Sequence, residues 1–128
     1  MTLVSFSLAV IVGLAGAFGA ASRYLLGRFI TERVNSQFPF GTFCINISGA
    51  FVIGLLFALA SRKLISPMLQ ATLATGFLGG YTTFSTMSWE GTQLARGGNT
   101  ACSLLYFGST FLFGLCAGIF GLVIGQML

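Results

Sequence analysis

The sequence predicts an all-α membrane protein with four transmembrane helices, and three observations lead to that prediction. Of the 128 residues, 55% are hydrophobic and only 6% are charged, and the mean hydropathy is +0.95. A soluble domain needs a much more polar surface, so lipid is the expected solvent. Four apolar runs, at about 4–28, 41–61, 68–95 and 100–127, are each long enough to cross hydrocarbon roughly 30 Å thick. Residues 1–128 are therefore predicted to form a single transmembrane domain.

The first run begins without the basic cluster of a cleavable signal peptide, so we expect a retained first span. Charged residues fall in the first connection (Arg28, Glu32 and Arg33), the second (Arg62 and Lys63) and the third (Arg96). With Arg23 near the end of the first span, the basic residues on the two sides nearly balance, and such residues set orientation. Two interpretations stay open: a single orientation, or dual topology with two copies paired antiparallel.

Small residues recur at spacings of three and four in two of the runs. They are Gly13, Gly16 and Gly19 in the first, and Gly114, Gly118, Gly121 and Gly125 in the last. Such spacing clears a groove in which two helices can approach closely. The pattern is equally expected for packing within one subunit and for association of two copies.

Asn46 lies near the start of the second run, within "GTFCINISG", and shares a helical face with Thr42 and Gly49. An amide without a partner is costly in hydrocarbon, so it must face protein or water. It either bonds a neighbouring helix, worth roughly 0.6–2 kcal/mol, or donates a hydrogen bond to an anion.

The third run contains "TGFLGGYTTFSTMSWE", which is unusually rich in residues that loosen a helix. Gly76, Gly79 and Gly80 predict a break near the middle of this span. Carbonyls released at a break suit an alkali cation, whereas N–H groups at the start of the next half-helix favour an anion. The hydroxyls that follow are Thr82, Thr83, Ser85, Thr86 and Ser88. Bonding back to the helix accounts for one or two of them but not for all five.

Enzyme chemistry is not expected from this composition. The chain has no histidine, its three cysteines lack metal-binding spacing, and its two glutamates stand 58 positions apart. A small dual-topology, proton-coupled multidrug exporter is the alternative function, but such an exporter needs a carboxylate in the middle of a span. Glu32 is expected in a loop and Glu90 near a span end.

These motifs identify a resemblance that covers nearly the whole chain. With "SRYLLG" late in the first run, "GTFCINISG" in the second and "TGFLGGYTTFSTMSWE" in the third, the sequence resembles the small bacterial fluoride channels of the CrcB/Fluc family. The resemblance implies an antiparallel, dual-topology homodimer of four-helix subunits with a broken third helix, in the inner or plasma membrane. It also implies two fluoride-selective passive pores, which let cytoplasmic fluoride leave the cell and give fluoride resistance. The implied partners are fluoride, a second copy and the lipid bilayer, without nucleic acid.

The resemblance also implies roles for individual residues. Asn46 looks like the asparagine that hydrogen-bonds fluoride, Arg23 like the basic residue near the aqueous vestibule, and Phe84 like a pore phenylalanine. The further residues it implies for the pore are Thr42, Ser85, Thr86, Tyr106 and Thr110, with Ser109 as a second candidate in the last helix. Gly79 and Thr82 look like the carbonyl donors that bind a structural Na⁺ at the dimer centre. Glu90 matches a family glutamate to which no role is assigned.

Met87 departs from the family pattern. The family usually reads Thr-Phe-Ser-Thr-Phe-Ser, and here a methionine stands at the second phenylalanine of the pore. A thioether is polarizable and flexible but lacks the fixed positive edge of a ring. We therefore expect ion identity to be preserved and throughput to be the property affected.

Overall fold

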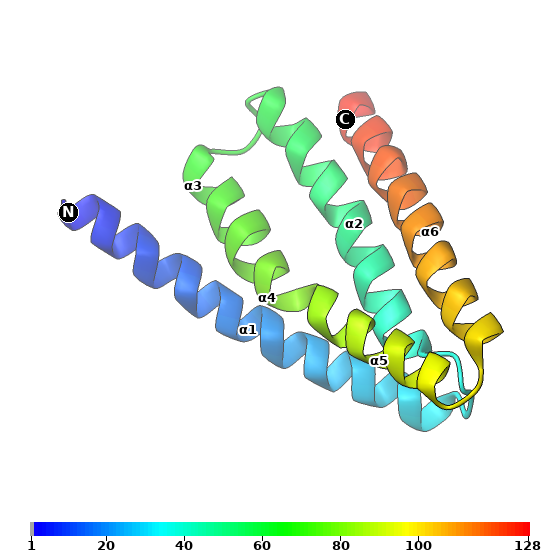
Figure 1. Cartoon of the computed structure of the whole chain (residues 1–128). Helices are drawn as coiled ribbons and strands as arrows, with labels where there is room; N and C mark the ends of the chain where they lie inside the picture. Colours follow the sequence, from blue (N-terminus) through cyan, green and yellow to red (C-terminus); the bar gives the residue numbers. More distant parts are fainter. Residues whose placement is uncertain (1) are drawn as a thin grey trace.

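The computed structural model describes residues 2–128 and consists of helices joined by short loops over that range (Figure 1). Its helical segments, in chain order, are α1 (Leu3–Arg33), α2 (Phe40–Ser61), α3 (Pro67–Gln70), η1 (Ala71–Leu78), α4 (Gly79–Tyr81), α5 (Phe84–Arg96) and α6 (Thr100–Met127). The segment η1 has the wider π-helical winding, whereas the other segments are α-helical. Figure 1 shows α2 and α6 running side by side, with α1 crossing the series α3–α5.

Three of these helices, α1, α2 and α6, are long and apolar enough to cross a membrane. Large apolar side chains on them point outward: the exposed fraction is 69% for Phe18, 62% for Phe57 and 77% for Phe111. Apolar surface on this scale is unfavourable in water and favourable in lipid. The prediction of an all-α membrane protein is confirmed.

The first helix is longer than its apolar run. It spans 31 residues, or about 46 Å at 1.5 Å per residue. Arg28, Glu32 and Arg33, expected in the first connection, therefore lie on its last turns, and that expectation was wrong. The reason is local: Arg28 Nε donates to Glu32 Oε1 at 2.7 Å, an i,i+4 ion pair that supports continued helix.

Polar caps fix where the later helices begin. Ser66 Oγ accepts from Leu69 N at 3.1 Å, and Pro67 occupies the first helical position of α3. Asn99 Oδ1 accepts from Cys102 N at 3.1 Å at the start of α6. Gly98, with φ of 88°, makes the turn just before that cap.

Glycines let two pairs of helices touch backbone to backbone. Where α1 crosses η1 and α4, a Cβ added at Gly19 would overlap the Phe77 carbonyl, and one at Gly80 would overlap the Gly16 carbonyl. Between α2 and α6, a Cβ at Gly121 would overlap the Phe51 carbonyl. Such contacts need small residues at both crossings. These glycines pack within one subunit, whereas a Cβ at Gly13 would meet nothing within 4 Å.

The helical path of the third apolar run is interrupted at Thr82 and Thr83, between α4 and α5. Both residues are extended, with φ and ψ of −76° and 159° at Thr82 and −151° and 120° at Thr83. The glycines at 76, 79 and 80 remain helical, and the extended residues begin two positions after Gly80. Gly76 and Gly80 instead serve the close contact with α1.

Candidate functional site at the interrupted helix

Asn46 of α2 makes a reciprocal pair of hydrogen bonds with Thr83. Its Nδ2 donates to the Thr83 carbonyl at 2.9 Å, and its Oδ1 accepts from the Thr83 N–H at 2.9 Å. In an uninterrupted helix that N–H would bond the Gly79 carbonyl, so the side-chain amide replaces a peptide group. Because a flipped amide would oppose like groups, the pair fixes its orientation and leaves one Nδ2 hydrogen to donate elsewhere.

Thr83 also caps the following helix. Its Oγ1 accepts from Thr86 N at 3.1 Å and donates to Thr86 Oγ1 at 3.1 Å. Sequence reasoning counted Thr83 only as one hydroxyl among five. The pattern that identifies it is a threonine directly before an α-helix and directly after an extended residue.

A cavity of about 370 Å³ opens on one side of Thr83, and we call it the break cavity. Among its lining residues are five of the predicted site residues: Asn46, Thr82, Phe84, Met87 and Thr110. Thr110 Oγ1 is buried and has no hydrogen-bond partner among residues 2–128. A hydroxyl in that condition is destabilising by about 1–3 kcal/mol unless a ligand or water bonds it.

A second cavity, of about 300 Å³, is also lined by Thr83, and we call it the arginine cavity. It is lined by three predicted site residues, Arg23, Thr42 and Thr86, together with Ala20, Tyr24, Gly27, Ile45 and Thr83. Thr83 lines both cavities. The predicted residues therefore fall into two groups, and Thr83, which Asn46 bonds, belongs to the lining of both cavities.

Four other candidates line neither cavity. Ser85 is exposed, and its Oγ lies 3.4 Å from Thr83 Oγ1. Ser109 Oγ donates to the Tyr106 carbonyl at 3.3 Å, so its hydroxyl is already used. Tyr106 is completely buried and its ring packs edge-on against Phe38, with centroids 5.4 Å apart. Gly79 is exposed on the outer surface of α4.

Glu90 of α5 links three helices. Thr42 Oγ1 of α2 donates to Glu90 Oε1 at 2.6 Å, and Tyr106 OH of α6 donates to the same oxygen at 3.4 Å. One residue later, the Gly91 carbonyl accepts from Ser103 Oγ at 2.7 Å. Thr42 and Tyr106 thus hydrogen-bond the carboxylate of Glu90, to which the sequence analysis assigned no role.

Comparison of the sequence with known proteins identifies the family of this chain. Residues 10–122 match the family model described as "CrcB-like protein, Camphor Resistance (CrcB)". The chain belongs to this family. CrcB-like relatives include one from Acidobacterium capsulatum, 44% identical over 90% of this chain and 93% of the relative, named "Fluoride-specific ion channel FluC". Relatives from Listeria monocytogenes and Aquifex aeolicus are each 42% identical, over 96% and 91% of this chain and 98% and 95% of their own, and carry the same type of name.

The lining of the break cavity in this CrcB-like chain contains polar but no charged side chains. Asn46 and Thr110 are two of its residues and both carry neutral donor groups. Neutral donors can replace part of an anion's hydration shell without holding it as tightly as a fixed positive charge would. The relatives compared above are named as ion channels.

Proposed function

We propose that this chain is a fluoride-selective passive ion channel, which lets cytoplasmic fluoride leave the cell and so gives fluoride resistance. The names of the relatives support fluoride as the transported ion. The observation that carries the proposal is the break cavity, which both Asn46 and Thr110 line: the Asn46 amide is oriented by Thr83, and the Thr110 hydroxyl is buried without a hydrogen-bond partner among residues 2–128. The second candidate, a proton-coupled drug exporter, is not favoured because these relatives are named as channels.

Fluoride is small and strongly hydrated, so a selective path must replace its water with donors held at fixed positions. The donors in this proposal are Thr110 Oγ1 and the remaining hydrogen of Asn46 Nδ2. The positive ring edge of Phe84 and the polarizable side chain of Met87 complete the wall. Hydrogen fluoride enters a cell as a neutral acid and dissociates at cytoplasmic pH, and a membrane that is negative inside then drives the anion out.

The proposal extends to the assembly. We propose that α3 to α5 together form the fourth membrane crossing and that two copies pair antiparallel in the inner or plasma membrane. The exposed fraction of Phe84 is 77% although the residue lines the break cavity, so one copy leaves this wall open to a neighbour. The nearly balanced basic residues are consistent with insertion in both orientations.

A structural Na⁺ at the centre of that dimer fits the residues present. Within residues 2–128, no group of three or more acidic, histidine or cysteine side chains could hold a metal ion, so backbone oxygens would have to bind it. Asn46 takes the N–H that the Gly79 carbonyl would otherwise receive, and Gly79 is exposed. With Thr82, each copy would offer two carbonyls, and the ion would join the two copies at the interrupted helices.

Efflux from liposomes tests the function. Purified protein is reconstituted into vesicles loaded with potassium fluoride, and fluoride release is followed with an ion-selective electrode after valinomycin, beside chloride-loaded vesicles. We expect rapid fluoride release without chloride release. Release of neither ion from protein that elutes as a monodisperse species would contradict the proposal, unless Met87→Phe restores release.

Two variants connect the efflux to the cavity. Thr110→Val keeps the shape and removes the hydroxyl, and it should slow fluoride release at least about tenfold, as expected for loss of one aimed donor. Ser109→Ala is the matched control, because that hydroxyl bonds the Tyr106 carbonyl and lines neither cavity. Equal rates for both variants would exclude Thr110 from the ion path.

A further inference from the structure

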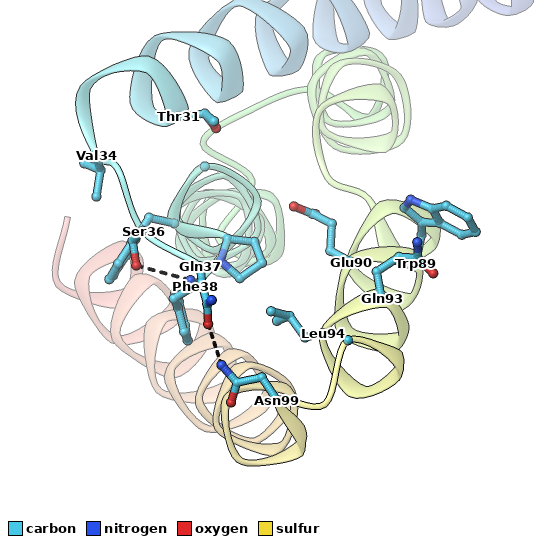
Figure 2. A pocket seen from close by; sticks show the side chains of 14 residues that line it. Thr31, Val34, Ser36, Gln37, Phe38, Trp89, Glu90, Gln93, Leu94 and Asn99 are labelled. Carbon is cyan, nitrogen blue, oxygen red and sulfur yellow. Dashed lines mark hydrogen bonds between the residues drawn. The ribbon is translucent and has the colours of Figure 1, made fainter.

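The helix α5 borders two cavities, and Met87 is the only sulfur-containing residue in the lining of either. One is an opening of about 420 Å³ beside the loops at one end of the bundle, where Figure 2 shows Trp89 and Glu90 of α5. The other is the break cavity, which Phe84 and Met87 line near the start of the helix. The wall of the proposed ion path therefore contains a side chain that oxidants attack readily.

Two other methionines provide a comparison. The exposed fraction is 47% for Met68 in α3 and 80% for Met127 at the end of α6, and neither residue lines the break cavity. Met87 is partly buried, and its side chain contributes to the cavity wall. Conversion to a sulfoxide would make Met68 or Met127 a more polar surface residue, but at Met87 it would change the lining of the break cavity.

The break cavity contains donors that a thioether leaves unused. The Thr110 hydroxyl is buried without a hydrogen-bond partner among residues 2–128, and Asn46 keeps one Nδ2 hydrogen beyond its pair with Thr83. A thioether sulfur is only a weak acceptor, so Met87 leaves both groups to an anion. A sulfoxide oxygen is polar, carries a partial negative charge and accepts hydrogen bonds well. On a side chain with several rotatable bonds, this oxygen can turn toward a donor in the same cavity.

We propose that Met87 is an oxidation site at which hydrogen peroxide closes the fluoride path. The sulfur lone pair attacks one peroxide oxygen, so that an S–O bond forms while the O–O bond breaks. Sulfur loses two electrons, a proton passes from the transferred oxygen to the departing one, and the peroxide leaves as water. The new oxygen accepts a hydrogen bond from Thr110 or Asn46 and presents negative charge to the anion. The path thus loses a donor and gains a repulsive group.

Fluoride release and peptide mass spectrometry on the same vesicles test the proposal, which rests on the proposed function. Native protein in vesicles loaded with potassium fluoride is treated with increasing hydrogen peroxide and then with dithiothreitol, which reduces disulfides and sulfenic acids at cysteines. Release is followed after valinomycin, and mass spectrometry gives the fraction of Met68, Met87 and Met127 that has gained one oxygen. We expect release to fall at least about tenfold, following the Met87 fraction and not the other two.

Met87→Leu and Met87→Phe are the matched controls, because neither new side chain is oxidised under these conditions and all three cysteines remain. Each variant is compared with its own untreated rate, which peroxide should not change. An equal loss of release in these variants overturns the proposal, because another residue is then responsible.

The native protein alone also decides the question. The proposal is overturned by unchanged release after Met87 has been converted, or by a Met87 that stays unmodified while Met68 and Met127 are oxidised. Absence of fluoride release before any treatment is a different failure: it contradicts the proposed function itself, and the inference with it. The untreated rate therefore tests the channel, and the ratio of treated to untreated rates tests the oxidation site.

Discussion

The two halves of the third apolar run differ in how they are held. Before Thr82, the segment α3–η1–α4 touches α1 through backbone atoms at Gly76 and Gly80. After Thr83, α5 is held by side-chain hydrogen bonds: Asn46 to Thr83, Thr42 to Glu90, and Ser103 to Gly91. Backbone atoms in contact fix the distance between two helices, whereas side-chain donors can also form hydrogen bonds to other groups. The first half is therefore a scaffold and the second half presents the polar groups.

The largest effect is expected where the scaffold half is broken. In Gly19→Ala the new methyl group would overlap the Phe77 carbonyl and lie 2.9 Å from the Phe77 carbonyl carbon. Backbone atoms cannot move aside easily, so we expect the free energy of unfolding to fall by about 3 kcal/mol or more. The measurement is the fraction of monodisperse protein after heating, by size-exclusion chromatography.

Gly13→Ala is the matched control for that prediction. It places the same methyl group on the same helix where nothing lies within 4 Å. Its thermal stability should match that of the native protein. If both variants lose stability equally, the backbone contact between Gly19 and Phe77 of η1 is not what holds α1 in place.

An intermediate effect is expected from Asn46→Asp, which tests the polar half. At pH 8 a carboxylate oxygen would oppose the Thr83 carbonyl, and the loss of the pair should destabilise the fold by about 2–3 kcal/mol. At pH 5 more of the introduced carboxyl is protonated, so its O–H can donate to that carbonyl while the other oxygen accepts from Thr83 N–H. Stability should therefore recover as the pH falls.

Transport separates the two roles of the amide. The protonated carboxyl restores the pair with Thr83 but has no second hydrogen, so fluoride release should stay low at pH 5 even though stability returns. Thermal unfolding and liposome efflux, each at both pH values, make the comparison. Recovery of efflux together with stability would show that Asn46 only positions Thr83.

The smallest effect is expected at the helix cap. Thr83→Ala removes the hydroxyl that accepts from Thr86 N and should cost about 1 kcal/mol, while Thr83→Ser keeps the acceptor and should stay within a few tenths. Both variants retain the backbone groups that Asn46 bonds. A thermal shift of equal size in the two would mean that packing of the methyl group, and not the cap, holds the start of α5.

Much of the fold followed from the sequence because apolar runs of this length have few alternatives to helices in lipid. The individual residues of the interruption did not follow, because glycine indicates where a helix can bend and Gly76 and Gly80 are instead needed for contact with α1. The end of α1 was also misplaced, since charges at 28 and 32 stabilise helix as an i,i+4 pair. Local composition cannot show whether a glycine bends a helix or packs against a neighbour, or whether a charged residue ends a helix or pairs along it.

The site was predictable in part. Asn46, Thr110, Phe84 and Met87 were named from the sequence and line one cavity. Thr83 was missed as a central residue because its importance lies in its backbone, whose partner is 37 positions earlier in the chain. Glu90 had no assigned role because hydrogen bonds from α2 and α6 define its surroundings.

The bond between Asn46 and Thr83 also has a consequence for biogenesis. The extended residue Thr83 carries a backbone N–H and carbonyl that lipid cannot satisfy. Their partner, Asn46, lies on α2, which precedes Thr83 in the chain and is synthesised first. The polar backbone of Thr83 can thus be matched by a helix made earlier, so the order of the helices along the chain is also a workable order of assembly.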